Sequence, residues 1–433
     1  MTKQENNDNR HRPNVPPLRF RGFTDPWQRK PLGELFVLRN GYTPSKSNPI
    51  YWENGDIPWF RMEDIREQGR ILGDAIQHVT KAAVKGAGLF PKDSFILSTT
   101  ATIGEHAWLT TDALANQQFT ILCTANRWDS LDIKYFHQYC FHLGDWCRRN
   151  VNVGGLNAVN IDGLREHQIP FPSLAEQEKI GSFFRALDEL IAAREEELEK
   201  LRQMKAALLD AMFPSDAPLE RVASATAHTL YDNLLDHTLQ AWDIVPTETS
   251  TPHTPRLRFR GFTDPWQRTD LKDVCSIKTG ELDANAMVED GAYPFFTCAK
   301  QTYKTDTYAF SGEAVLIAGN GEVGLTKYYN GKFNAYQRTY VLQSSRNDIV
   351  LRFILNHIEY GLPKRIAPLL FGSAMPYITL NTLNDMPIYV PSLAEQKQID
   401  AFFRSQDEGI ATATEQIDKL KRIKQACLKQ MFV

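Results

Sequence analysis

Residues 172–184 read PSLAEQEKIGSFF, and residues 391–403 read PSLAEQKQIDAFF. A second stretch, LRFRGFTDPWQR, stands unchanged at residues 18–29 and 257–268. Because both stretches recur in the same order, the chain is a tandem duplication. Each copy has closely matched ends and a different centre, which is the pattern of a shared scaffold that carries two different domains.

Each PSLAEQ stretch opens a segment that predicts a long helix. Ser173 and Ser392 are suited to the N-cap, and Glu176 and Glu395 follow three residues later, as in a capping box. Apolar residues then recur at heptad spacing, which favours pairing of the two helices as a coiled coil. The alternative is that each helix packs on its own domain. The residues expected to pair the helices are Ile180, Phe184, Leu187, Ile191, Leu198, Leu201 and Leu208 in the first copy, and Ile399, Phe403, Ile410, Ile417, Leu420 and Ile423 in the second.

The centres read as mixed α/β (α+β) domains. Apolar runs predict strands over residues 93–98 and 118–122 in the first centre, and over 313–318 and 339–342 in the second. Asn330-Gly331 predicts a two-residue hairpin turn. The predicted order is a disordered polar tail (1–17), a first domain (18–171), a helix (172–213), a connector with a flexible linker (214–256), a second domain (257–390) and a second helix (391–433).

Composition narrows the class of protein. The 433 residues carry a formal charge of -3, which counts against a nonspecific nucleic-acid coat, because such proteins are usually strongly basic. The six cysteines show no metal-finger spacing and read as reduced thiols. No apolar segment reaches the length of a membrane helix, and no signal peptide is recognisable at the N-terminus. We therefore expect a cytoplasmic protein.

No motif in the sequence supports a catalytic residue or a metal site. Residues 319–324 (GNGEVG) fit the dinucleotide pattern G-x-G-x-x-G, but such a site needs a helix to follow. Residues 325–331 read instead as a hairpin, so a turn between strands is the better interpretation. An α/β enzyme that uses this loop is the rival hypothesis.

Aromatic and polar residues are mingled in both centres. Such mixtures suit a surface that contacts DNA phosphates and base edges, although the aromatic residues can equally be core and the charges solvated. The candidate DNA contacts are Tyr42, Thr43, Ser45, Lys46, Arg61, Thr102, Gln117 and Gln118 in the first centre, and Lys300, Tyr303, Lys304, Asn320, Lys327, Gln337 and Arg338 in the second.

In the order of its motifs, the chain resembles the DNA specificity subunit of type I restriction–modification enzymes. The two helix openings look like that family's helical repeats. The motifs that look like those of its target-recognition domains are residues 41–45 (GYTPS), 57–59 (IPW), 101–104 (ATIG) and 116–118 (NQQ). The second centre departs from this pattern, with residues 293–295 (YPF) in place of IPW and residues 336–337 (YQ) in place of NQ.

The resemblance implies a subunit with no catalytic activity and no cofactor of its own. Two target-recognition domains would each read half of a split, asymmetric sequence in double-stranded DNA, and the helices, paired antiparallel, would hold them apart. The helices would also dock two methyltransferase subunits, which bind S-adenosylmethionine. The apolar residues named above for helix pairing are the candidates for this docking as well. Restriction and translocase subunits that use ATP and Mg²⁺ would join that core. The alternative function is a coiled-coil scaffold without sequence-specific DNA binding.

Overall fold

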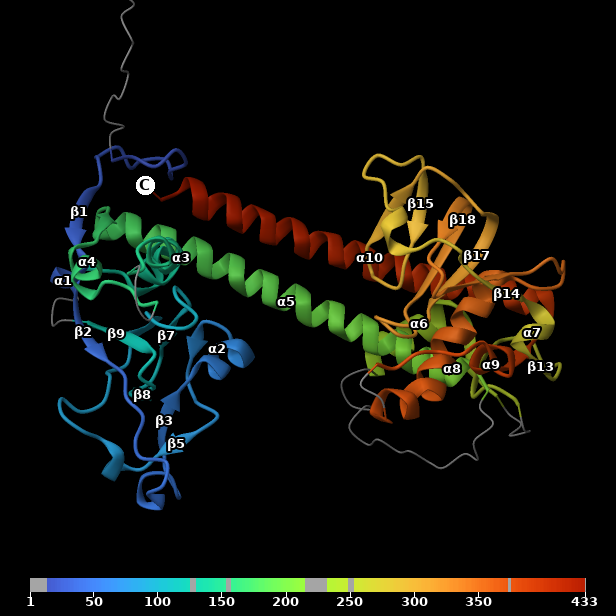
Figure 1. The fold of residues 1–433 in the computed structure, drawn as a ribbon, viewed down its shortest axis with the longest axis horizontal. Coiled ribbons are helices and arrows are strands. Elements are labelled where there is room, and N and C mark those ends of the chain that lie inside the picture. Colours follow the sequence, from blue (N-terminus) through green and yellow to red (C-terminus); the bar gives the residue numbers. More distant parts are fainter. Residues whose placement is uncertain are drawn as a thin grey trace, which may run out of the picture. The chain divides into compact units, whose positions relative to one another are not determined.

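The computed structural model describes residues 14–124, 130–152, 157–214, 232–247, 253–372 and 375–432 (Figure 1). The chain forms two compact units. The first unit contains residues 1–194 and 416–433, and the second contains residues 195–415. Each unit therefore holds one variable centre together with parts of both long helices. Residues 1–13 of the predicted tail and 248–252 of the predicted linker lie outside the described residues.

The first unit contains strands β1 (Gln28–Pro31), β2 (Phe36–Asn40), β3 (Ile57–Phe60), β4 (Ile71–Leu72), β5 (His78–Val79), β6 (Phe95–Ser98), β7 (His106–Leu109), β8 (Leu114–Ala115), β9 (Phe119–Thr124) and β10 (Gln168–Phe171). Its shorter helices are α1 (Leu32–Leu35), α2 (Met62–Gln68), α3 (Ile133–Arg149) and α4 (Ile161–Glu166). One sheet has the order β2-β9-β6-β7-β4, and a second sheet has the order β5-β3-β8.

Strand β6 lies in the middle of the larger sheet, which explains its unbroken apolar sequence. On one face, Phe95 packs on Phe136 of α3, with ring centroids 4.9 Å apart. On the opposite face, Ile96 belongs to the hydrophobic cluster that contains Trp59 of β3. Because both faces of the strand are covered, neither favours polar residues.

The second unit contains strands β11 (Ile244–Pro246), β12 (Leu257–Phe259), β13 (Gln267–Asp270), β14 (Ser276–Thr279), β15 (Tyr293–Phe296), β16 (Thr302–Thr305), β17 (Phe310–Ala318), β18 (Thr326–Ala335), β19 (Thr339–Gln343) and β20 (Pro387–Val390). Its shorter helices are α6 (Asp232–Ala241), α7 (Leu271–Val274), α8 (Leu351–Gly372) and α9 (Leu380–Asn384). The main sheet has the order β14-β19-β17-β18-β15-β16.

The four predicted strands are confirmed as β6, β9, β17 and β19. The predicted turn at Asn330-Gly331 is wrong, because β18 continues through it and Gly331 lies opposite Gly312 of β17. Between β17 and β18 the chain reverses at residues 319–325 instead, as the turn interpretation of the GNGEVG stretch predicts. The long antiparallel ladder of β17 and β18 overrides the local turn preference of the Asn-Gly pair.

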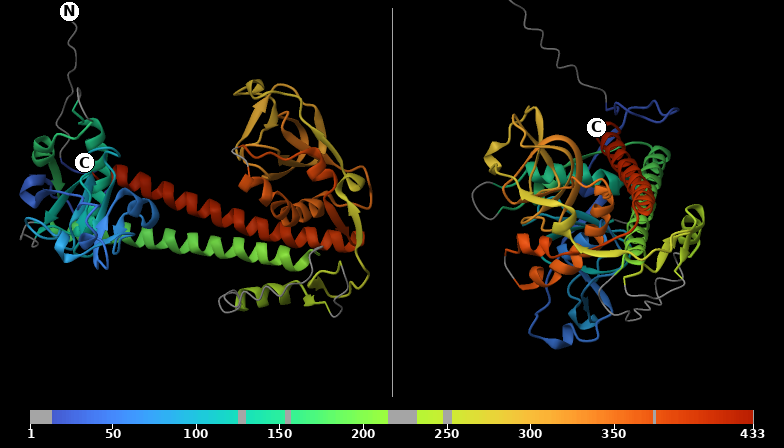
Figure 2. Two further views of the ribbon diagram at one scale, coloured as in Figure 1. Left: turned by 60° about the horizontal axis from the view of Figure 1, so that its bottom comes forward. Right: turned by 90° about the vertical axis from the view of Figure 1, so that its right-hand side faces the viewer.

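The two predicted long helices are confirmed as α5 (Leu174–Met212) and α10 (Leu393–Gln430) (Figures 1 and 2). In the first unit, Phe184 of α5 packs on Phe432, just beyond α10, with ring centroids 6.2 Å apart. Farther along α5, Asp188 pairs with Lys424 of α10 at 2.5 Å. Residue numbers rise along one helix as they fall along the other, so the helices are antiparallel.

In the second unit the same direction holds. Lys205 of α5 pairs with Asp407 of α10 at 2.6 Å, and Phe213 contacts Phe403, with ring centroids 6.1 Å apart. The residues that follow each helix then enter the core of a domain. Phe432 packs on Trp27 in the first unit, and Phe213 packs on Trp266 in the second. The helices therefore pair with one another, as predicted, and the end of each helix also packs on the domain of the other copy.

Burial of the predicted helix stripe is uneven. Ile180, Phe184, Leu187, Ile191, Leu198, Leu208, Ile399, Phe403 and Ile417 are buried, and Leu201, Ile410 and Leu420 are half-buried. Ile423 is 41% exposed, so its expected part in helix pairing or in subunit docking stays a prediction. A heptad pattern marks an apolar stripe but does not say how many helices cover it.

The repeated motifs bind each other. Arg19 donates from Nε and Nη2 to both carboxylate oxygens of Glu176, at 2.6 and 2.8 Å. Arg258 binds Glu395 in the same way, at 2.7 and 2.8 Å. The expected capping role of the two glutamates is therefore wrong, because their carboxylates clasp the lead-in stretches. This clasp explains physically why LRFRGFTDPWQR and PSLAEQ occur together in both copies.

The glutamine that follows each clasp glutamate fixes the helix from another side. Gln177 donates to the carbonyl of Ser130 at 3.0 Å and accepts from the backbone N–H of Asp132 at 2.9 Å. Gln396 makes the matching bonds to Asp348 and Val350, each at 2.9 Å. Together, the clasp and the glutamine join the helix start to the lead-in stretch of its own domain and to the segment that opens α3 or α8.

Membrane helices, metal sites and disulfides are absent from the described residues. No helix among them is long and apolar enough to cross a membrane. No group of His, Cys, Asp or Glu residues in this part of the chain is arranged to hold a metal ion. All six cysteines are free thiols, and four of them are buried.

Candidate nucleic-acid interface

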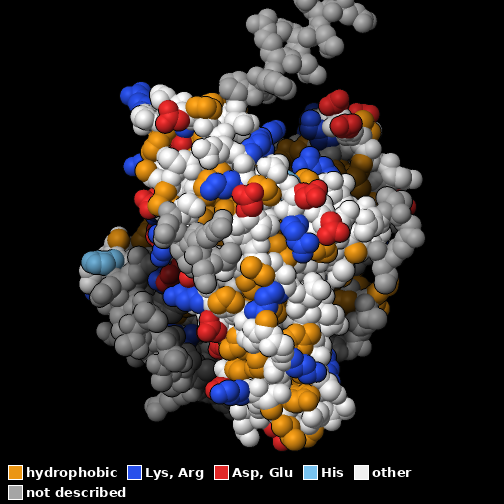
Figure 3. All heavy atoms as spheres, turned by 90° about the vertical axis from the view of Figure 1, so that its left-hand side faces the viewer, with side chains coloured by type: hydrophobic (Ala, Val, Ile, Leu, Met, Phe, Trp, Pro, Cys, Tyr) orange, Lys and Arg blue, Asp and Glu red, His pale blue; other side chains and the backbone are white. Residues whose placement is uncertain are grey.

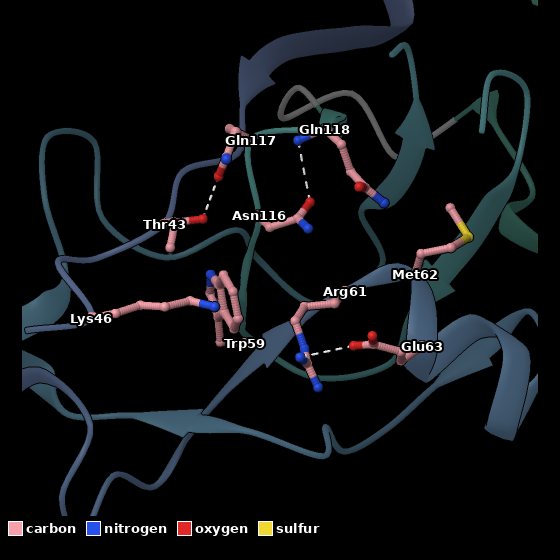
Figure 4. Close-up of a pocket in the computed structure, with 9 residues that line it drawn as sticks. All are labelled: Thr43, Lys46, Trp59, Arg61, Met62, Glu63, Asn116, Gln117 and Gln118. Atoms are coloured by element: carbon pink, nitrogen blue, oxygen red, sulfur yellow. Dashed lines mark hydrogen bonds and ion pairs between the residues drawn. The ribbon is translucent and has the colours of Figure 1, made fainter. Parts of the chain in front are cut away.

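In the first domain, five predicted contact residues line one hollow of about 270 Å³ (Figure 4). Its walls are Thr43, Lys46, Trp59, Arg61, Met62, Glu63, Asn116, Gln117 and Gln118. They come from the loop after β2, from β3 and the start of α2, and from the turn between β8 and β9. Thr43, Lys46, Arg61, Gln117 and Gln118 are therefore brought together, although they lie far apart in sequence.

Backbone hydrogen bonds hold these loops against each other. The N–H of Gly41 donates to Phe119 at 3.0 Å, and the N–H of Asn116 donates to Phe60 at 3.0 Å. A Cβ atom on Gly41 would overlap the carbonyl oxygen of Asn116, so only glycine allows this close approach. The side-chain oxygen of Asn116 in turn accepts the N–H of Gln118 at 3.2 Å.

Two side chains of the hollow are held by specific partners. The Thr43 hydroxyl donates to Oε1 of Gln117. This hydrogen bond fixes the orientation of the Gln117 side-chain amide and therefore the direction of its nitrogen. Arg61 pairs with Glu63 at 2.8 Å, and its guanidinium lies 5.8 Å from the centre of the Trp59 ring. The Trp59 ring is fixed from behind, because its Nε1 donates to the Tyr42 carbonyl at 3.0 Å. The hollow thus presents side-chain amides, a hydroxyl and two cations beside the fixed ring of Trp59.

Three predicted contacts of the first domain do not line the hollow. The Tyr42 hydroxyl donates to Ala83 and accepts from the N–H of Lys85, each at 3.0 Å, and burial raises the pKa of this phenol. The Ser45 hydroxyl is 3.0 Å from that of Ser47. The Thr102 hydroxyl lies 3.4 Å from that of Ser98. Tyr42 thus holds a loop in place, and Ser45 and Thr102 have hydroxyl neighbours outside the hollow.

Four residues that the sequence did not indicate as contacts also line the hollow: Asn116, Trp59, Met62 and Glu63. Asn116 could have been found, because it opens the NQQ stretch that looks like a family motif. Trp59 lies in the IPW stretch and could have been found in the same way. Met62 and Glu63 carried no such signal, since their place at the hollow follows from where α2 begins.

The second domain repeats the backbone framework with different side chains. The N–H of Tyr336 donates to Phe296 at 2.9 Å, as Asn116 does to Phe60. The N–H of Gly319 donates to Arg338 at 2.9 Å, which matches the bond from Thr99 to Gln118. These matches place Tyr336 and Arg338 where the first domain has Asn116 and Gln118.

Loops at residues 297–300, 319–324 and 336–338 form the corresponding surface. The N–H of Glu322 donates to Cys298 at 3.2 Å, and the Lys300 ammonium lies 3.9 Å from the Glu322 carboxylate. These loops bring together the predicted contacts Lys300, Asn320, Gln337 and Arg338. The predicted contacts Tyr303 and Lys304 lie on β16, at the edge of the sheet.

Lys327 is engaged within the protein. Its ammonium donates to the carbonyls of Ala299 and Lys300 at 2.8 and 2.7 Å, and burial lowers its pKa. This lysine therefore fixes the loop that carries Lys300. The face of the first unit in Figure 3 shows basic and acidic side chains interspersed, with no continuous basic patch.

Comparison with known proteins places the chain among DNA specificity proteins. A family model described as "Type I restriction modification DNA specificity domain" matches residues 24–203 and again residues 263–422. The type I restriction enzyme EcoprrI specificity subunit of Escherichia coli is 31% identical over 406 residues, which are 92% of this chain and 91% of that protein. The MjaIX specificity subunit of Methanocaldococcus jannaschii is 24% identical over 428 residues, 94% of this chain and 92% of that protein.

One solved structure shows the same fold at low sequence identity. The crystal structure of a type I restriction–modification S subunit from M. genitalium superposes with a TM-score of 0.56. It covers 97% of this chain and 99% of its own, at 16% identity. The duplicated arrangement of domain and helix is therefore shared with that protein.

Proposed function

Because this chain belongs to the family of type I restriction–modification DNA specificity subunits, we propose that it reads a split DNA sequence, with one half-site bound by each variable domain. The observation that carries the proposal is the shared loop framework with different side chains. A common framework suits a common task, and different side chains suit different base sequences. The target is therefore asymmetric.

In the first domain, the hollow that contains Gln117 is the proposed site of base reading. With Oε1 bound to Thr43, the Gln117 amide offers its nitrogen as a donor to a base acceptor. Lys46 and Arg61 supply positive charge for phosphates or for guanine. Loss of one bidentate base contact should cost about 1–3 kcal/mol of discrimination at a single base pair.

In the second domain, Arg338 is the proposed principal base contact. It is exposed and stands where the first domain has Gln118, and a guanidinium can bind guanine through two hydrogen bonds. Lys300 and Asn320 flank it. A lysine that contacts only phosphate would instead weaken binding to all sequences alike.

The catalytic steps are assigned to other subunits. We propose two methyltransferase subunits that bind S-adenosylmethionine and methylate adenine, and restriction and translocase subunits that use ATP and Mg²⁺. Methylation requires the target base to leave the stack, and a partner's pocket would receive it. The nearly balanced charge of this chain fits a subunit that selects bases while partners supply much of the phosphate grip. Such an assembly works in the cytoplasm.

The test is a domain exchange. Residues 18–171 are replaced by the corresponding domain of a relative, and methylated sites are mapped across a genome that carries the cognate methyltransferase. One half of the target should change while the other half and the asymmetry remain. An unchanged half-site would contradict the role of the domain. If the chain with its methyltransferase bound all DNA sequences equally, the scaffold alternative would hold instead.

A further inference from the structure

Tyr377, in the segment that leads into α9, is an exposed aromatic residue beside the loop that carries Arg338. The Tyr377 side chain is 59% exposed, whereas the next residue, Ile378, is 3% exposed. The N–H of Ile378 donates to the carbonyl of Gly319 at 2.8 Å, and the carbonyl of Ile378 accepts the hydroxyl of Tyr340 at 2.8 Å. The N–H of Gly319 in turn donates to Arg338. Tyr377 is therefore joined, through one buried neighbour, to the loops proposed to read DNA.

The backbone on both sides of Tyr377 is held in place. The residue before it is Pro376, whose ring restricts the backbone dihedral φ. Two residues after it, Thr379 caps α9, because its hydroxyl accepts the N–H of Thr382 at 3.2 Å. An exposed ring on such a support would lose little backbone entropy on binding a ligand. This is the property expected of a residue that makes a specific contact.

The first domain has the same framework with a different residue at this position. The N–H of Val159 donates to Thr99 at 2.9 Å, and Val159 is 3% exposed, as Ile378 is. The residue after Val159 again caps a short helix, α4. The residue before it, which matches Tyr377, is Ala158. The aromatic ring is thus one of the side chains in which the two domains differ on a shared backbone.

We propose that Tyr377 is a specificity-determining residue of the second domain, and that its ring contacts the 5-methyl group of a thymine beside the base pair that Arg338 reads. This inference rests on the proposed function and names one base contact within it. In the major groove, the thymine methyl is an apolar feature among hydrogen-bond donors and acceptors, so an apolar side chain reads it. The predicted contacts on the neighbouring loops are all polar, namely Lys300, Asn320, Gln337 and Arg338. Tyr377 adds the apolar group that they lack.

The composition around Tyr377 favours a base contact over a phosphate contact. Residues 366–384 contain no lysine, arginine, aspartate or glutamate. Affinity for phosphates comes mainly from positively charged side chains, and this segment offers none. A neutral ring next to polar reading loops suits a base edge that carries an apolar group.

The probe is a DNA duplex that carries the target sequence mapped from the methylated sites, bound by the full chain together with its methyltransferase. Each thymine of the half-site assigned to the second domain is replaced in turn by uracil, which lacks only the 5-methyl group. Dissociation constants are measured by competition. At one base pair, uracil should weaken binding by about three- to fivefold, as expected for one buried methyl group. Uracil in the other half-site is the control, because its effects should not depend on Tyr377.

Variants of the protein complete the cycle. Tyr377→Ala should weaken binding to the thymine duplex by about three- to tenfold and should make the thymine and uracil duplexes bind alike. Tyr377→Phe keeps the ring and should bind within about twofold of the unchanged chain. The matched control is Tyr308→Ala, which should keep the full uracil effect. Tyr308 is 45% exposed in the same domain, but it precedes β17, whereas the loop at 319–324 follows that strand.

Three results would overturn the proposal. One is a half-site in which uracil weakens binding at no base pair. Another is a uracil effect that Tyr377→Ala leaves intact, which would give the methyl contact to a different residue. The third is equal weakening by Tyr377→Phe and Tyr377→Ala on every sequence, which would make the hydroxyl a phosphate contact. If the complex bound target and random duplexes equally, the half-site proposal would fail and this inference with it, so the two failures are distinguishable.

Discussion

The two units bind the start of a long helix through the same types of residue, but the hydrogen-bond partners of these residues differ between the units. In the first unit, Glu176 accepts from Arg19 and also from Nε1 of Trp27, at 3.1 Å. In the second, Glu395 accepts from Arg258, while Nε1 of Trp266 has no hydrogen-bond partner among the described residues. Duplication therefore preserved the ion pair and let its surroundings diverge. The difference shows which parts of the scaffold depend on a single contact.

The largest expected effect comes from the aromatic residues that enter the domain cores after the helices. Phe432→Ala should destabilise the first unit, and Phe213→Ala the second, by about 3–5 kcal/mol each, because both rings are buried. Hydrogen exchange resolved by peptide would measure each unit separately. Equal loss of protection in both units from one substitution would contradict the division into separately packed cores.

The next largest difference in stability between the two units is expected from the clasps, the Arg19–Glu176 and Arg258–Glu395 ion pairs. Arg258→Ala should cost about 3–5 kcal/mol, because it leaves a buried carboxylate without its charged partner. Arg19→Ala should cost less, about 2 kcal/mol, since Trp27 still donates to Glu176. Denaturant unfolding of the two variants gives the comparison. The double variant Arg19→Ala, Trp27→Phe should remove the advantage of the first unit, and an unchanged ranking would refute this explanation.

Acid should weaken the first unit through its buried histidines. Burial and nearby Arg70 lower the pKa of His106 to about 3, and burial lowers that of His137 to about 4. The unfolded chain binds protons below pH about 6.5 while these folded histidines do not, so stability is complete above that pH and is lost as the pH falls. At pH 5 the loss is about 2 kcal/mol for each histidine.

Hydrogen exchange at pH 7 and pH 5, corrected for intrinsic rates, would measure this loss in peptides of the first unit. His106→Gln should remove about half of the loss that these two histidines cause, because the amide does not titrate while His137 still does. An equally steep dependence in that variant would assign the acid effect to other groups.

The smallest expected difference lies in the turns beside the reading loops. Ala101 has φ 55° and its counterpart Gly321 has φ 62°, so the first turn holds a side chain in the left-handed region. Ala101→Gly should stabilise the first unit by at most about 1 kcal/mol, and Gly321→Ala should destabilise the second by a similar amount. Thermal unfolding of the reciprocal pair would test this, and effects of the same sign would contradict it.

Periodicity and repetition predicted most of the architecture. Short apolar runs indicate the four strands and heptad spacing indicates both long helices, and both signals are local properties of the sequence. The turn at Asn330-Gly331 was misplaced because a local preference lost to a long strand ladder. Of the predicted contacts in the first domain, Thr43, Lys46, Arg61, Gln117 and Gln118 meet at one hollow. Tyr42 does not, because its hydroxyl serves a neighbouring loop.

The amino-acid sequence alone indicates that the chain is a duplication, that each copy ends in a long helix with an apolar stripe, and that the centres differ. The repeated stretches and the heptad spacing are properties of the sequence itself and can be recognised without a structure. The folded structure was needed to show that Glu176 binds Arg19 instead of capping its helix, and that Met204 is buried while Ile423 is exposed. Such outcomes depend on which distant side chain arrives at a residue, and neither composition nor spacing carries that information.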